Sequence, residues 1–275
     1  MNLKYLGTAA AEGIPALFCT CRVCENARKV GGKEIKTRSQ AVVDGKILID
    51  FPADTYMHAL LHGVDLPSIR TCLLTHNHGD HLYERDLWCR NKGVAYGVED
   101  TTLHLYADTA GYEQLDAYIS AAVGDNRVAV HAITPCESFE VEGYAVTPLR
   151  ASHDPGSSPV IFLIEKDGKI LFYANDTSDF PEATWEYLEK YGRAIDLLSL
   201  DCTEMLRETD YVGHSDLRGA HRIVERLKQM GIVTDRTKVV LNHFSHNGRA
   251  THEEFAAAAA RYGYDVSYDG YTVEF

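Results

Sequence analysis

Short apolar runs alternate with amphipathic segments along nearly the whole chain. Short apolar runs bounded by turn-forming residues predict β-strands, whereas apolar residues that recur every three or four positions predict helices. The predicted strands are Leu3–Gly7, Ala41–Val43, Ile47–Asp50, Thr71–Thr75, Leu103–Tyr106, Val128–Ile133, Ala145–Leu149, Val160–Ile164, Ile170–Tyr173, Asp196–Leu200, Lys238–Asn242 and Tyr271–Phe275. The predicted helices are Ala53–His62, Glu84–Cys89, Gly111–Val123, Pro181–Tyr191, Ser215–Met230 and His252–Tyr262.

Turn and cap signals separate these segments. Asp-Gly pairs at 44–45, 167–168 and 269–270 lie between predicted strands, and Asp-Gly suits the positive φ of tight hairpin turns. Ser215 predicts a helix N-cap, and Thr251 with Glu254 three residues later predicts a capping box. Many strands in hairpins, covered by interspersed helices, indicate a mixed sheet packed into layers.

Composition narrows the class of protein. The 275 residues carry a formal net charge of −13, which argues against a general nucleic-acid binder because such proteins need Lys and Arg to displace phosphate counterions. No stretch approaches the roughly 18 apolar residues of a membrane span. The N-terminal residues 1–7 lack a signal-peptide pattern, so we expect a cytoplasmic protein. There, disulfides are disfavoured, and the seven cysteines are expected to be metal ligands or buried apolar groups.

The strongest chemical signal follows a predicted buried strand, in the segment Thr75–His81. His76, His78, Asp80 and His81 place four potential ligands within six residues, and a glycine at position 79 permits a sharp turn. Imidazoles combined with a carboxylate suit Zn, Mn or Fe. A solvated loop with several histidines by chance is the alternative, and the repeated ligand spacing disfavours it.

This motif resembles the signature His-x-His-x-Asp-His of the metallo-β-lactamase fold superfamily. Further matching positions occur downstream in the expected order, namely His153 after Leu149–Ser152, Asp176 after Phe172–Asn175 and His243 after Val239–Asn242. Asp50, after Leu48-Ile49, resembles the aspartate with which the superfamily supports its ligands. Each downstream match is weak alone, and together in this order they are strong.

The resemblance implies an α/β (α+β) fold, a four-layer αββα sandwich, formed by a single hydrolase domain over residues 1–275. It also implies two divalent ions, Zn or Mn, at one edge of two facing sheets. The implied ligands are His76, His78 and His153 for one ion, Asp80, His81 and His243 for the other, and Asp176 as the bridge between them. A metal-bridging hydroxide would then be the nucleophile.

A second cluster, Cys19, Cys21 and Cys24, has the spacing Cys-x-Cys-x2-Cys. Three thiols can hold a soft metal, tetrahedral zinc needs a fourth ligand, and His246 is the candidate. A reactive or incidental thiol loop is the alternative. The pairing resembles a narrower subgroup, the phosphoribosyl cyclic phosphodiesterases of the carbon–phosphorus lyase pathway, in which these four residues hold a structural zinc in a Cys-rich loop near 19–24.

The same subgroup has residues that resemble Asp201-Cys202 and His214. The resemblance implies that Asp80 and His214 are catalytic, with His214 contacting the substrate phosphate or protonating the leaving oxygen. A surface histidine near a helix cap is the alternative for His214.

The predicted function is therefore hydrolysis of a small or cyclic phosphodiester by a binuclear metal site. Three alternatives stay open: a thioester or lactone hydrolase, an RNA 3′-end-processing nuclease of the same fold, and a non-catalytic metal-binding protein. The expected partner is a small anionic phosphodiester substrate. Binding to a membrane or to nucleic acid is not expected, and the formation of a homodimer is left open. Fold resemblance alone does not identify the substrate.

Overall fold

Two seven-stranded sheets form the centre of the computed structural model, which describes residues 1–124, 126–154, 156–210 and 212–275. The strand order of the first sheet is β14 (Thr272–Glu274), β1 (Asn2–Gly7), β2 (Gln40–Val43), β3 (Ile47–Ile49), β4 (Thr71–Leu73), β5 (Leu103–Ala107) and β6 (Val128–Ala132). The order of the second is β13 (Asp265–Val266), β12 (Lys238–Asn242), β11 (Leu197–Asp201), β10 (Lys169–Ala174), β9 (Val160–Lys166), β8 (Tyr144–Arg150) and β7 (Phe139–Val141).

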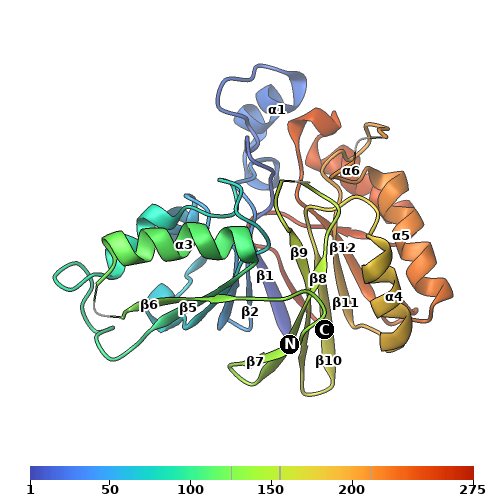
Figure 1. The fold of residues 1–275 in the computed structure, drawn as a ribbon. Coiled ribbons are helices and arrows are strands. Elements are labelled where there is room, and N and C mark those ends of the chain that lie inside the picture. Colours follow the sequence, from blue (N-terminus) through green and yellow to red (C-terminus); the bar gives the residue numbers. More distant parts are fainter. Residues whose placement is uncertain (125, 155, 211) are drawn as a thin grey trace.

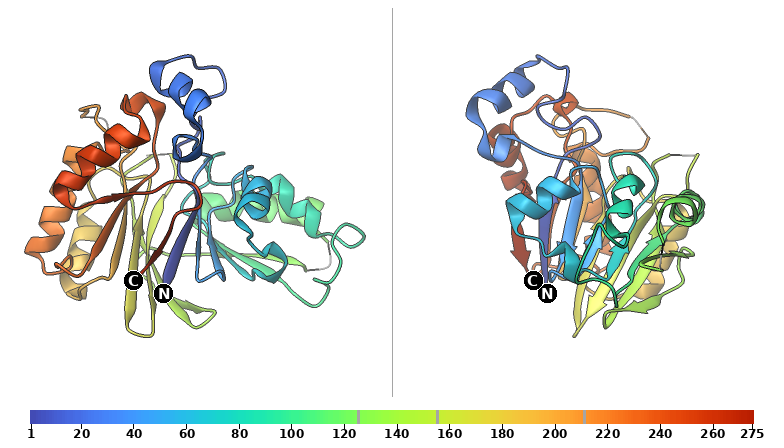
Figure 2. Two further views of the ribbon diagram at one scale, coloured as in Figure 1. Left: turned by 180° about the vertical axis from the view of Figure 1, so that it is seen from behind. Right: turned by 90° about the vertical axis from the view of Figure 1, so that its left-hand side faces the viewer.

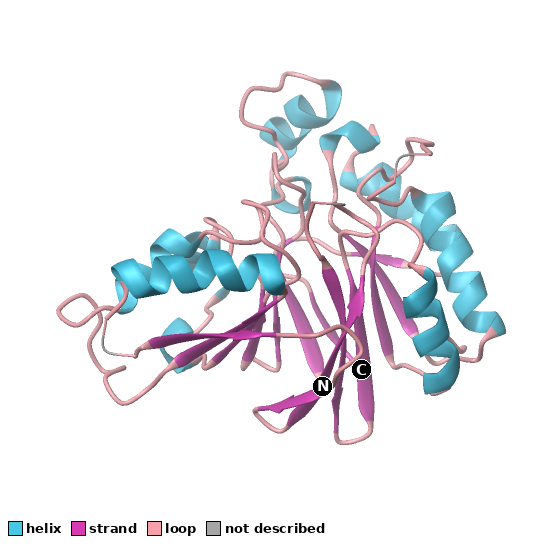
Figure 3. Ribbon diagram, in the orientation of Figure 1, coloured by secondary structure: helices cyan, strands magenta, loops and turns pink. Residues whose placement is uncertain are grey.

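Helices cover the outer faces of both sheets (Figures 1 and 3). The α-helices are α1 (Arg22–Val30), α2 (Thr55–His62), α3 (Thr109–Ala122), α4 (Glu182–Tyr191), α5 (Leu217–Gln229) and α6 (His252–Ala259). Short 3-10 helices span Gly32–Glu34, Leu66–Ser68, Glu84–Arg90, His246–Gly248 and Ala260–Tyr262. Figure 2 shows the two chain ends side by side, at the opposite end of the molecule from α1.

Three apolar layers hold these elements together. Ile49 and Leu73 from the first sheet pack with Phe162 from the second, and all three are fully buried. Leu115 of α3 belongs to a separate core outside the first sheet, and Val224 of α5 to another outside the second. Because each sheet buries both faces, the chain forms the expected four-layer αββα sandwich.

Two of the three predicted Asp-Gly hairpins are confirmed. Asp44 and Asp167 have φ values of 49° and 50°, and the glycines after them also have positive φ, between antiparallel strands. The prediction for Asp269-Gly270 is wrong because β13 and β14 belong to different sheets. There the partly buried Asp269 carboxylate instead accepts hydrogen bonds from Thr8 and Thr37.

The structure confirms one of the two predicted helix N-caps. Thr251 and Glu254 form the predicted capping box of α6. At α5 the N-cap is Asp216, whose carboxylate accepts from the Gly219 amide, and not Ser215 as predicted. Asp216 takes this role because it immediately precedes the first helical residue, Leu217, whereas Ser215 lies one residue earlier and donates its amide to Asp201.

The topology brings polar residues to one edge of the two sheets. Strands β3 and β4 run parallel, as do β10, β11 and β12, so their C-terminal ends lie at a common edge of each sheet. Within three residues of those ends come Asp50, His76, Asp176, Asp201 and His243. The C-terminal edge is where sheets with parallel strands usually bind ligands. Among the helices of the described ranges, none is both long and apolar enough to cross a membrane.

Candidate metal centre

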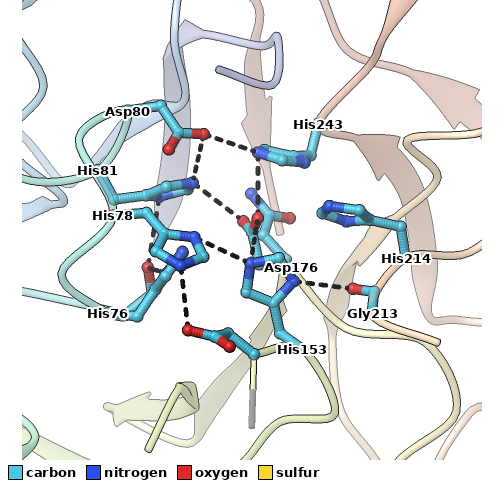
Figure 4. A network of polar contacts seen from close by, with 12 residues as sticks. His76, His78, Asp80, His81, His153, Asp176, Gly213, His214 and His243 are labelled. Carbon is cyan, nitrogen blue, oxygen red and sulfur yellow. Dashed lines mark hydrogen bonds and ion pairs between the residues drawn. The ribbon is translucent and has the colours of Figure 1, made fainter. Parts of the chain in front are cut away.

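Three histidines converge from two loops. His76 and His78 lie in the loop after β4, and His153 follows β8. Their ring centroids are 4.5 to 5.0 Å apart, and Nε2 of His153 lies 3.2 Å from Nδ1 of His78. One nitrogen of each ring lies within 4.8 Å of those of the other two. The structure thus brings together the three residues predicted for the first ion (Figure 4).

A second group forms beside the first. His81 Nε2 lies 3.3 Å from Asp80 Oδ2, and His243 Nε2 lies 3.9 Å from the same oxygen. His81 and His243 are fully buried, so these groups meet in an environment largely closed to solvent. The residues predicted for the second ion therefore also lie together.

Asp176 lies between the two groups. It follows β10 with a φ of 51°, a conformation that turns the chain sharply at the strand end. One carboxylate oxygen lies 3.2 Å from His81 Nε2, and the other lies 3.3 Å from His243 Nε2 and 3.9 Å from His153 Nε2. Asp176 therefore contacts both groups, as a bridging ligand must.

The donor set fits metal ions. Within the described part of the chain, four buried atoms of the two groups make no hydrogen bond: Nε2 of His76, His81 and His243, and Oδ2 of Asp176. Buried polar atoms without partners are costly, and several of them converging on one point need a common ligand. Imidazole nitrogens with carboxylate oxygens are the set that Zn and Mn accept.

Other residues orient the imidazoles. Nδ1 of His81 lies 2.7 Å from Asp50 Oδ2, and Nδ1 of His243 lies 2.8 Å from Thr203 Oγ1. Nδ1 of His153 lies 3.1 Å from the Gly213 carbonyl oxygen. When the outer nitrogen is held in this way, Nε2 faces the centre as a lone-pair donor, which is the usual arrangement of metal-binding histidines.

The charges at the centre favour a cation. Burial opposes protonation of His81, but the carboxylates of Asp176, Asp80 and Asp50 outweigh it and raise the His81 pKa well above its usual range. Burial likewise opposes ionisation of Asp176, but His243 and His81 outweigh it and hold the Asp176 pKa well below its usual range. The centre therefore stabilises positive charge.

His214 and Asp201 form a pair beside this centre. His214 Nδ1 lies 3.1 Å from Asp201 Oδ2, and its ring stacks on His243 with centroids 5.4 Å apart. Burial opposes charge on both groups, but their mutual attraction outweighs it, so the pKa of His214 rises to about 9 and that of Asp201 falls to about 2. The structure thus places His214 beside the ligands, and Asp201 holds it there.

These residues line a cavity of about 270 Å³. Its wall includes His78, Asp80, His153, Asp176, His214 and His243, together with Ala10, Ala11, Glu12, Thr203, Glu204, Ser245 and Asn247. The sequence did not single out Glu12 or Thr203, because only the fold brings their segments to this edge. The volume lies just below the roughly 300–1,000 Å³ of typical small-molecule sites, so it suits a small ligand.

The Cys-rich loop meets its predicted partner. Sγ of Cys19 and Sγ of Cys21 lie 3.6 and 3.5 Å from Nδ1 of His246, and one ligand atom each of Cys19, Cys21, Cys24 and His246 lies within 4.8 Å of the others. Burial opposes ionisation of the Cys21 thiol, but the Cys24 amide and His246 outweigh it and lower its pKa to about 6. Three thiols and one imidazole match a tetrahedral zinc site.

The chain resembles known proteins over most of its length. Residues 46–244 match the family model described as "Beta-lactamase superfamily domain". A curated octanoyltransferase from Porphyromonas gingivalis (strain ATCC BAA-308 / W83) is 26% identical over 273 residues, covering 96% of this chain and 50% of that protein. The chain therefore spans about half the length of the curated relative it matches.

Solved structures share the fold. A new diphosphatase from the PhnP family is 24% identical, with 100% of this chain and 97% of that chain covered and a TM-score of 0.77. Zn(2+)-bound PqqB from Methylobacterium extorquens is 21% identical, with 100% of both chains covered and a TM-score of 0.75. At these identities the likeness is one of fold.

Proposed function

Since the chain belongs to the beta-lactamase superfamily, we propose that it is a binuclear metal-dependent phosphodiesterase that hydrolyses a small or cyclic phosphodiester. Water would add to phosphorus and one P–O ester bond would break, which leaves a phosphomonoester and an alcohol. The observation that supports it most strongly is the pair of ligand groups joined by one carboxylate, Asp176, in a single cavity.

The chain's own residues supply the binding geometry. His76, His78 and His153 would hold one Zn or Mn ion, and Asp80 with His81 and His243 would hold the other. When bound, the two ions supply Lewis acidity, which stabilises charge on the phosphoryl oxygens and lowers the pKa of water to near neutral. Cys19, Cys21, Cys24 and His246 would hold a structural zinc that fixes the loop at the edge of the cavity.

His214 is the proposed proton donor. Its ring lines the cavity, and Asp201 and Thr203 each lie 3.1 Å from Nδ1, so the ring is held in one orientation. A positioned imidazolium next to the scissile bond can protonate the leaving alkoxide, which matters most when that alkoxide is a strong base.

An acyl substrate, a thioester or a lactone, is the second candidate. The curated relative is named for the transfer of an octanoyl group, an acyl reaction, although this chain spans only half of that protein. A metal site that promotes hydrolysis at phosphorus can also promote hydrolysis at the carbonyl of a thioester or lactone. The net charge of −13 disfavours a long RNA substrate, which would meet a repelling surface.

The experiment is a comparison of substrates and variants. Protein purified without chelator is assayed with bis-p-nitrophenyl phosphate, a ribose cyclic phosphate, an acyl thioester and an RNA with a 3′ extension. We expect the two small diesters to be hydrolysed, and Asp80→Ala and Asp176→Ala to abolish turnover while circular dichroism stays normal. Asp100→Ala, an exposed aspartate, is the control and should retain activity. Hydrolysis of the thioester alone, or full activity in both site variants, would refute the proposal.

A further inference from the structure

Glu12 lies in the wall of the cavity and is not one of the proposed metal ligands. It lies in the turn after β1, and this turn is fixed to the segment after β12 by two backbone hydrogen bonds. The Ala10 amide donates to the Phe244 carbonyl at 2.9 Å, and the Phe244 amide donates to the Thr8 carbonyl at 2.8 Å. The position of Glu12 at the cavity is therefore set by the fold.

One oxygen of the Glu12 carboxylate is held. Oε1 accepts a hydrogen bond from the Ser245 hydroxyl and lies 3.8 Å from His246 Nε2. Ser245 is itself fixed, since its amide donates to the Thr203 carbonyl at 3.1 Å and its hydroxyl accepts from the Asn247 amide at 3.0 Å. The carboxylate thus has a defined location.

The other oxygen is available. Taking the described segments of the chain together, no hydrogen bond or ion pair involves Oε2 of Glu12, and the side chain is 31% exposed. The second glutamate in the wall also has an oxygen without a hydrogen bond, but it has a cationic partner, because Glu204 Oε2 lies 3.4 Å from Arg207. Of the two wall glutamates, Glu12 is therefore the one whose second oxygen is not paired with an arginine and can accept a hydrogen bond.

The chemistry of a carboxylate restricts what it can meet. An ionised carboxylate only accepts hydrogen bonds, and it repels phosphate oxygens. A phosphodiester held by the two ligand groups must then turn a hydrogen-bond donor, and not a further anionic group, toward Glu12. In a small phosphodiester that donor is a hydroxyl or an amino group of the esterified alcohol, and a hydroxyl is the donor that a sugar or other polyol supplies.

We propose that Glu12 is a specificity-determining residue that accepts a hydrogen bond from a hydroxyl of the substrate's alcohol moiety. This inference rests on the proposed phosphodiesterase function and narrows its substrate class to esters of a polyol such as a sugar. Esters that carry a second phosphate at that position are excluded by charge. A site that hydrogen-bonds a substrate hydroxyl discriminates strongly against the analogue that lacks it.

The alternative role of Glu12 is to hold His246 for the Cys-rich cluster. Glu12→Gln separates the two roles because its amide oxygen can still accept from Ser245, whereas its NH2 group cannot accept from a substrate hydroxyl and the charge-assisted bond to the carboxylate is lost. Glu99→Gln removes the charge of an exposed glutamate outside the cavity and is the matched control.

The test compares a ribose cyclic phosphate with its analogue in which the free hydroxyls are replaced by hydrogen. We expect Glu12→Gln to lower the ratio of the two kcat/KM values, hydroxyl over deoxy, by about tenfold or more. Zinc content and melting temperature should stay at wild-type values, and Glu99→Gln should leave the ratio unchanged. An unchanged ratio in Glu12→Gln, with or without zinc loss, would overturn this inference alone. Absence of turnover of both esters by the wild type would refute the proposed function and this inference with it.

Discussion

Asp50 should control metal affinity without touching the metal. Its carboxylate is fully buried and accepts from Nδ1 of His81 at 2.7 Å and from the amide and hydroxyl of Thr75, both at 2.9 Å. In Asp50→Asn one amide oxygen remains as the acceptor for the donors that two carboxylate oxygens served before. The NH2 group of the asparagine cannot accept a hydrogen bond from the His81 ring. The substitution therefore releases His81 or reverses its tautomer.

The size of the effect follows from the role of this contact. Loss of the outer partner of a metal-binding histidine weakens metal binding by about 10–100-fold, which corresponds to about 1.4–2.7 kcal/mol. We expect a loss of this size for the ion held by His81 and a smaller loss for the ion held by the His76 group.

Competition between the protein and a chromophoric chelator measures the zinc dissociation constants, and the two that belong to the ions joined by Asp176 are compared between variants. Asp269→Asn is the matched control, because Asp269 is a partly buried carboxylate that also accepts from threonines, here Thr8 and Thr37, but lies against no proposed ligand. Both variants should lose stability, and only Asp50→Asn should lose affinity. Dissociation constants within twofold of wild type, or an equal loss in both variants, would refute the reasoning.

Three further predictions concern other parts of the molecule. Cys21→Ser should lower zinc content and melting temperature relative to Cys136→Ser, an exposed cysteine, and normal values of both would exclude the structural zinc. His214→Ala should retain its metals but slow hydrolysis of alkyl esters by about 100-fold or more, with a smaller loss on p-nitrophenyl esters; equal losses would argue against proton donation. Burial lowers the pKa of Lys36 from 10.5 to about 8 in the folded protein. At a pH between these two pKa values, Lys36 is protonated in the unfolded chain and mostly neutral in the folded protein. In that pH range Lys36 should therefore make the free energy of unfolding rise by up to about 1.4 kcal/mol per pH unit. Urea denaturation at pH 8 and pH 10 should show this rise in the wild type and a smaller one in Lys36→Met; identical rises would contradict it.

The sequence predicted the elements that carry strong local signals. Apolar runs such as Lys238–Asn242 appear as strands at the expected positions, because burial on both faces makes the run continuous. Strands β7 and β13 were missed, since each is only two or three residues long and exists through pairing with its neighbour. Helix α1 was missed because its buried residues are few, and two of them, Val23 and Cys24, lie within the cysteine spacing that suggested a loop.

The candidate site likewise contains residues that the sequence predicts and residues that only the fold brings together. The motif residues His76 to His81 are adjacent in sequence, so their proximity could be predicted from spacing alone. The downstream ligands depended on a family resemblance, because nothing local places His153 beside His78. The groups that orient them, such as Thr203 and the Gly213 carbonyl, give no signal in sequence at all: a threonine or a backbone carbonyl acquires its role only through tertiary contact.

The metal dependence of turnover tests the proposed binuclear mechanism. The protein is stripped with chelator, dialysed, and assayed on a ribose cyclic phosphate before and after addition of Zn²⁺ or Mn²⁺. We expect no turnover before addition, and turnover that reaches its maximum when the two ligand groups joined by Asp176 are filled. Equal turnover with and without metal, or none after full metal loading, would contradict it.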